Sequence, residues 1–143
     1  DVIGFKFGKA KDGSDSILAI YEVKTQFSGS KPNQRLQDAV DGSKKDPIRK
    51  AESLNCIKQR LRMQEGKRIA SRISRFQNPA DNPYKEISGA AALFSEELFD
   101  PDLIQTTVTK EHPNVNNLEL IVFKGANFMQ LVNTLYQIAA DEA

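Results

Sequence analysis

The chain has 143 residues, of which 39% are hydrophobic and 27% charged, a composition typical of one folded domain with a substantial core. It has one cysteine and one histidine, which excludes an internal disulfide and a zinc site of the usual Cys/His type, so any metal must be held by oxygen. No apolar run reaches about 18 residues and no signal-peptide pattern is present, so a cytoplasmic protein without a membrane partner is expected by default.

The net charge of +1 conceals an uneven distribution of charged residues. Residues 44–80 hold eleven basic and three acidic side chains, a net +8, whereas residues 81–143 hold three basic and ten acidic ones, a net −7. As a group, the basic residues predict contact with a polyanion. For any single one of them, a solvated helix face is the simpler interpretation.

The first expected element is a β-hairpin formed by residues 1–7 and 16–25. Both segments have strand-like composition, and the polar stretch between them holds an Asp-Gly turn signal. Paired residues in such a hairpin have numbers that sum to about 23 to 25. Asp1 then lies opposite Glu22, or opposite Lys24 with Glu22 diagonal to it, and the three charged groups converge at one end of the hairpin.

Glu22 and Lys24 follow an apolar run on one face of the second strand. Side chains alternate across a strand, so both project from the face that also carries Leu18 and Ile20. Burying an unpaired charge is costly, so we expect the two charges to hold each other, a metal ion or a substrate. A plain cross-strand ion pair at a sheet edge is the alternative to a catalytic role.

The rest of the chain is expected to hold further helices and two more strands. A short helix is predicted at residues 33–43, and the helical pattern at 48–76 is one long bent helix or two consecutive ones, with Asp46 as a possible cap. Strands are predicted at residues 87–94 and 118–124, followed by a final helix capped by Asn127. Together these elements predict an α/β domain, a mixed β-sheet flanked by helices.

Several other side chains have structural rather than chemical interpretations. The final helix carries an apolar packing stripe of Phe128, Leu131, Val132, Leu135 and Ile138. Core positions are expected for the aromatic residues Phe5, Phe7, Phe123 and Phe128. His112 is interpreted as an ordinary surface histidine, and Cys56 as a small semi-buried residue.

Asp1, Glu22 and Lys24 form an arrangement suited to cleaving a phosphodiester bond. Mg²⁺ prefers carboxylate and carbonyl oxygens, so Asp1 and Glu22 are expected to bind it, with the backbone carbonyl of Val23 as a third ligand. The ion would activate water and neutralise phosphate charge. Lys24 would orient that water or stabilise the developing negative charge. Sharing one ion requires the carboxylates of Asp1 and Glu22 to lie within roughly 8 Å of each other.

These residues resemble the catalytic motif of the PD-(D/E)XK nuclease superfamily, which has the restriction-endonuclease-like fold. More narrowly, the chain is similar to the HamA family, the nuclease subunit of the Hachiman antiphage defence system, in DVIGFKF, IYEVKTQFSG, AESLNCIKQRLR and LELIVFKGANFMQLVNTLYQIAADEA. The resemblance implies a Mg²⁺-dependent deoxyribonuclease, with Mn²⁺ able to substitute, that acts with a helicase partner. It assigns Asp1 and Glu22 to metal binding and Lys24 to catalysis.

The chain departs from that superfamily at its front. The superfamily core has a helix and a strand before the strand that carries the Asp, and this sequence opens at Asp1 without them. We therefore expect residues 1–143 to form a single nuclease-like domain, the C-terminal part of a longer protein. An upstream segment of the same protein is expected to complete the fold.

Contacts with DNA are expected close to the motif. Lys31, Gln34 and Arg35 follow the catalytic strand and are placed to touch the substrate near the scissile bond. Lys44 and Lys45 open the basic segment, whose cations are suited to a phosphate backbone.

Two alternatives accompany this interpretation. A second Glu-x-Lys sequence, Glu65-Gly66-Lys67, is rejected because it lies in a basic helical stretch with no apolar strand beneath it. The alternative function is that of a catalytically inactive module with the same fold, which binds nucleic acid or a protein partner.

Overall fold

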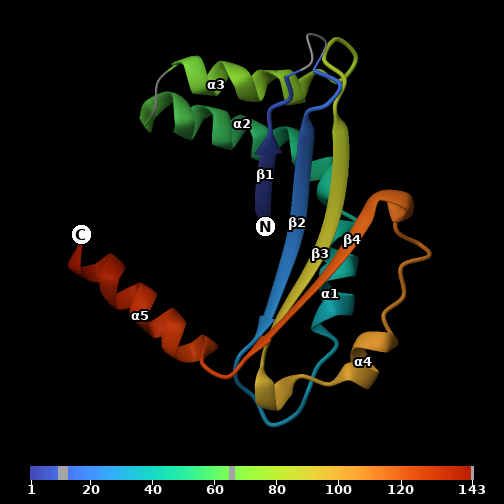
Figure 1. Cartoon of the computed structure of the whole chain (residues 1–143), viewed down its shortest axis with the longest axis vertical. Helices are drawn as coiled ribbons and strands as arrows, with labels where there is room; N and C mark the ends of the chain where they lie inside the picture. Colours follow the sequence, from blue (N-terminus) through green and yellow to red (C-terminus); the bar gives the residue numbers. More distant parts are fainter. Residues whose placement is uncertain (10–12, 65–66, 143) are drawn as a thin grey trace.

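The computed structural model describes residues 1–9, 13–64 and 67–142, and its centre is a four-stranded sheet in the order β1-β2-β3-β4 (Figure 1). Strands β1 (Val2–Lys6) and β2 (Ile17–Gln26) pair antiparallel. Strands β3 (Lys85–Ser95) and β4 (Leu118–Gly125) each run parallel to the preceding strand. The predicted mixed sheet of an α/β domain is confirmed.

The hairpin pairs in the first of the two predicted registers. Val2 pairs with Tyr21 and Lys6 with Ile17, so the paired numbers sum to 23. Asp1 directly precedes this ladder, and the register continues to Glu22. Because successive side chains of a strand point to opposite faces of the sheet, Glu22 shares a face with Leu18 and Ile20.

Helices α1 (Arg35–Ser43), α2 (Asp46–Gln64) and α3 (Lys67–Ser74) form the connection between the parallel strands β2 and β3. The predicted stretch at 48–76 is thus two helices, which lie side by side in Figure 1, followed by a 3₁₀ turn at Arg75–Gln77. A further 3₁₀ turn (Glu96–Leu98), the short helix α4 (Pro101–Gln105) and the turn Val115–Asn117 lie between β3 and β4. No described helix is both long and apolar enough to cross a membrane.

All three connecting helices cover the same face of the sheet. Leu18 and Ile20 of β2 pack with side chains of the second and third helices and the turn after them, namely Leu54, Ile73 and Phe76. Phe5 and Phe7 pack against this cluster, as predicted. Farther along the face, Ala90 packs with two residues of α1, Ala39 and Val40. Glu22 pairs with Ala90 in the ladder, so it lies where the region covered by α1 begins.

The opposite face of the sheet carries Tyr21, whose ring lies over Gly89 of the neighbouring strand. The Tyr21 hydroxyl donates a hydrogen bond to the Glu119 carboxylate, and this bond raises the pKa of Tyr21 to about 12. Phe123 lies on this face as well and is 53% exposed. Its predicted core position is wrong, because none of the connecting helices covers this side of the sheet.

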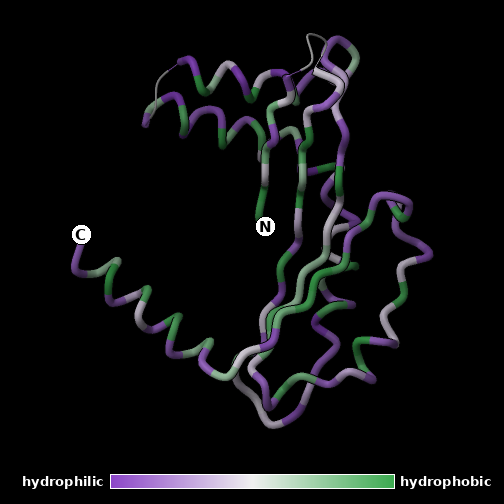
Figure 2. Tube along the Cα trace, in the orientation of Figure 1, coloured by the Kyte–Doolittle hydropathy of each residue, from purple (hydrophilic) through white to green (hydrophobic). Residues whose placement is uncertain are grey.

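Helix α5 (Phe128–Asp141) leaves the end of β4 and runs away from the sheet (Figure 1). Figure 2 shows apolar and polar residues alternating along it, which agrees with the predicted stripe. Within the described chain, however, Leu131, Leu135 and Ile138 are about half exposed, so these three members of the predicted packing stripe are not buried. Among the described residues, Phe128 in the first turn stacks on Phe27, and the Asn127 side chain makes no capping hydrogen bond. Periodicity indicates that a helix has an apolar face but does not specify its partner.

Replacement of Gly89 by alanine is expected to destabilise the sheet. The new Cβ would lie 1.9 Å from Cδ1 of Tyr21 in the present arrangement, so the ring must move and its bond to Glu119 is lost. We expect the free energy of unfolding, measured in urea, to fall by about 1–3 kcal/mol. Gly4→Ala is the matched control, since its Cβ meets only the Ala19 Cβ at 3.9 Å. Equal stability of the two variants would contradict this packing.

Candidate metal centre

Three carboxylates from separate parts of the chain meet beside β2. Asp1 precedes β1, Glu22 lies within β2, and Asp46 is the first residue of α2. One carboxylate oxygen from each lies within 4.8 Å of the others. The predicted proximity of Asp1 and Glu22 is therefore present, and Asp46 adds a carboxylate that the sequence had suggested only as a helix cap.

The backbone brings these groups together at the junction between α1 and α2. The amide of Lys45 donates to the carbonyl of Gly42, which turns the chain so that the second helix begins at Asp46. Gly42 also makes room for Glu22, because a Cβ at Gly42 would lie only 2.8 Å from the Glu22 Cγ. A glycine at this position therefore allows the buried glutamate to reach the start of α2.

Glu22 and Asp46 are buried without enough partners for their charge. Each residue is only 5% exposed, and the Oε2 of Glu22 and the Oδ2 of Asp46 have no hydrogen-bond partner among the described residues. Burial, and then repulsion from Glu22, raise the pKa of Asp46 to about 6. Unpaired buried carboxylates carry a large desolvation cost, which a bound cation would offset.

The donor set fits a hard divalent cation. Mg²⁺ binds carboxylate oxygens at about 2.1 Å, so two of its ligands are separated by at most roughly 4.2 Å. The three oxygens lie within 4.8 Å of one another, so a small movement of the side chains would bring them into range of one ion. Asp1, Glu22 and Asp46 are thus the residues that could hold such an ion.

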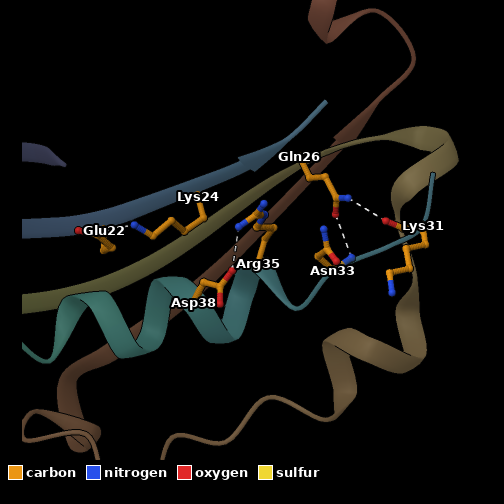
Figure 3. A network of polar contacts seen from close by, with 7 residues as sticks. All are labelled: Glu22, Lys24, Gln26, Lys31, Asn33, Arg35 and Asp38. Atoms are coloured by element: carbon orange, nitrogen blue, oxygen red, sulfur yellow. Dashed lines mark hydrogen bonds and ion pairs between the residues drawn. The ribbon is translucent and has the colours of Figure 1, made fainter. Parts of the chain in front are cut away.

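Lys24 contacts the same carboxylate cluster. Its Nζ donates to Oε1 of Glu22 at 2.6 Å, and its side chain is 37% exposed, so the ammonium is held at the cluster and still faces solvent (Figure 3). An ion pair is therefore present, but it joins two residues of the inner strand β2, whereas the structural alternative was a cross-strand pair at a sheet edge. It occupies Oε1 of Glu22, while Oε2 of Glu22 and Oδ2 of Asp46 have no hydrogen-bond partner among the described residues.

The structure divides the other predicted site residues into two groups. Lys31, Gln34 and Arg35 line one cavity at the beginning of α1. Lys44 and Lys45 lie at the end of that helix, where Lys44 pairs with Asp41 and Lys45 is exposed beside Asp46. Binding of Mg²⁺ by the backbone carbonyl of Val23 stays a prediction.

His112 is not the surface residue that the sequence suggested. It is 3% exposed, and its Nε2 lies 3.0 Å from the Ser43 hydroxyl, which itself donates to the carbonyl of Val40. The imidazole Nε2 therefore donates to Ser43, while Nδ1 accepts from the amide of Asn114. This arrangement fixes the end of α1, three residues before Asp46. No spacing signal in the sequence marks this histidine.

One minor expectation is wrong, and a second lies mostly outside the described residues. Cys56 is exposed rather than semi-buried, because it lies on the outer side of α2. The rejected motif Glu65-Gly66-Lys67 lies largely outside the described residues, and its last member begins α3.

Comparison with protein families gives a match to the HamA family over residues 1–139. The matched region includes all three carboxylates and Lys24. No curated protein and no solved structure matches the chain.

Without divalent cations, Asp46→Asn is expected to stabilise the protein near neutral pH. The pKa of Asp46 is about 6 in the fold, above its ordinary value of 3.8, so its ionised form opposes folding above pH 6. That cost disappears as the pH falls from about 6 to about 4. Urea unfolding at about pH 7 should show a gain on the order of 1 kcal/mol, shrinking at about pH 4.5.

Asp41→Asn provides the control of opposite sign. Asp41 is exposed, and its hydrogen bond from Lys44 lowers its pKa, so its neutralisation should give no gain in stability. An Asp46→Asn variant that is less stable than the wild type at neutral pH would show that Asp46 carries no uncompensated charge.

Proposed function

The chain belongs to the HamA family and is thus a component of Hachiman defence, and from this premise we propose that it is a metal-dependent deoxyribonuclease. The observation that carries the proposal is a pair of buried carboxylates beside a partly exposed lysine, each with one oxygen that has no hydrogen-bond partner among the described residues. Such a cluster costs stability in the absence of a ligand, which is typical of a functional site. The resemblance to the PD-(D/E)XK motif assigns the restriction-endonuclease-like fold to the same domain.

Asp1, Glu22 and Asp46 would hold Mg²⁺, and Mn²⁺ could replace it. The ion supplies a water nucleophile near neutral pH and neutralises charge on the scissile phosphate. The chain contributes the geometry. Glu22 is fixed by a strand and Asp46 by the start of a helix, whereas Asp1 is exposed and would supply the third carboxylate ligand.

Lys24 has a role distinct from metal binding. Its ammonium is held 2.6 Å from Glu22, which keeps one positive charge beside the acidic cluster and in reach of solvent. When Glu22 binds an ion, the ammonium can turn toward the phosphate oxygens or the attacking water. There it would stabilise negative charge that develops during bond cleavage.

DNA would reach this centre along a basic surface. Lys45 and Arg49 are exposed on either side of Asp46 in the sequence, and exposed arginines continue along α2 and α3 at Arg60, Arg62, Arg68 and Arg72. These basic side chains are numerous enough to contact several DNA phosphates, which predicts DNA binding that weakens steeply as the salt concentration rises. A helicase partner, implied by the family resemblance, would deliver or unwind the substrate.

Loss of any one group of the centre should abolish cleavage. We expect Glu22→Gln, Asp46→Asn and Lys24→Ala each to reduce plasmid cleavage by the intact protein at least about 100-fold with Mg²⁺ or Mn²⁺. The assay includes the helicase partner, and circular dichroism checks that each variant is folded. Glu52→Gln and Lys85→Ala are the controls, since both side chains are exposed and lie outside the centre.

The same experiment distinguishes the alternative of a non-catalytic binding module. Cleavage by the three variants at the wild-type rate, or DNA binding without cleavage under every metal and partner condition, would reject the nuclease proposal. In the second case the Lys24–Glu22 ion pair would be a structural feature of a binding domain.

A further inference from the structure

A polar cavity of about 580 Å³ opens at the beginning of α1. Its charged and polar lining includes Lys31, Gln34, Arg35 and Asp38, and the helix α4 contributes Leu103. Figure 3 shows that Glu22, Lys24 and then Arg35 and Asp38 of this lining follow one another along β2 and α1, with Lys31 beyond them. The cavity is thus a separate place from the carboxylate cluster but lies on the same side of the sheet.

The loop that forms the cavity is held in shape by Gln26. This side chain is 4% exposed and projects from the same face of β2 as Glu22 and Lys24. Its amide nitrogen donates to the carbonyl of Lys31 at 2.9 Å, and its amide oxygen accepts from the Asn33 amide at 2.9 Å. Both ends of one buried amide therefore fix the segment that carries the basic residues.

The two cations of the cavity are available to an anion. Lys31 is exposed and forms no ion pair within the described chain. Arg35 donates from one Nη to Asp38 at 3.0 Å, and its buried Nε has no partner among the described residues. The guanidinium is positioned by one carboxylate and its side chain is 37% exposed, so its outward-facing N–H groups are suited to donate to a phosphate.

We propose that this cavity binds a backbone phosphate of the DNA strand a few nucleotides away from the scissile bond. The proposal rests on the nuclease function and adds a second anchoring point for the substrate. Helix α1 has nine residues and spans about 13 Å, and the four-residue step from Glu22 to Gln26 covers a similar length of β2. The cavity therefore lies roughly 13 Å from the carboxylates, a distance that a few nucleotides of one DNA strand can span.

Replacement of Asp38 tests the proposal through the direction in which DNA affinity changes. Its carboxylate competes with a phosphate for Arg35, so removal of its charge should strengthen DNA binding, whereas removal of either cation should weaken it. If the Arg35–Asp38 pair served only to stabilise α1, loss of either member would act in the same direction.

The experiment measures binding of a fluorescent DNA duplex by anisotropy over a series of salt concentrations. All proteins are the intact chain with Glu22→Gln, which blocks cleavage and keeps the cavity. Lys31→Gln and Arg35→Gln should each weaken binding about 5- to 20-fold and reduce the slope of log affinity against log salt by about 1. Asp38→Asn should tighten binding several-fold, and Lys85→Gln, at the start of β3, should leave it unchanged.

Unchanged binding in the cavity variants, or weaker binding in Asp38→Asn as well as in Arg35→Gln, would overturn the phosphate site. Failure of the nuclease proposal is recognised separately. If the cation variants weaken DNA binding and Asp38→Asn strengthens it, but the wild-type protein never cleaves plasmid, the protein has the phosphate site without the activity. If the wild-type protein cleaves plasmid and Glu22→Gln does not, but the cavity substitutions leave DNA binding unchanged, the protein has the activity without this phosphate site. Absence of any DNA binding would reject both.

Discussion

Glu22 and Asp46 hold two carboxylates at one largely buried place, and burial, followed by repulsion from Glu22, raises the pKa of Asp46 to about 6. Neither residue has a full set of hydrogen-bond partners within the described chain, and Lys24 satisfies only one oxygen. A fold that keeps such a pair carries a cost that apolar residues at these positions would avoid. The cost is understandable if the site exists to receive a cation, because binding then turns the repulsion into a source of affinity.

The surrounding structure is organised to keep this pair in place. The hairpin register extends to bring Asp1 beside Glu22, and Gly42 lets the glutamate side chain approach the start of α2. From the other side, buried His112 fixes Ser43 through a hydrogen bond of 3.0 Å, just before the chain turns toward Asp46. Each carboxylate is thus positioned by backbone elements that are themselves restrained, as a site requires if it must select one geometry.

Much of the fold and part of the site follow from local sequence signals. Period-two alternation and a turn signal narrowed the hairpin to two registers, one of which pairs Asp1 with Glu22, because hairpin register depends on local sequence. Asp46 could not be found in this way, since its place beside Glu22 depends on how α1 and α2 pack on the sheet. His112 was misplaced for the same reason. The apolar stripe of α5 was identified correctly as a pattern, but its contact was not, because amphipathicity leaves the partner undefined.

The most direct test of a cation site at the carboxylates is diffraction from crystals of the intact protein soaked in Mn²⁺. An anomalous difference map should show one ion within about 2.1 Å of oxygens from Asp1, Glu22 and Asp46. The Asp46→Asn variant should lose this ion. An ion bound elsewhere, or carboxylates that stay without an ion at Mn²⁺ concentrations that support cleavage, would contradict the account.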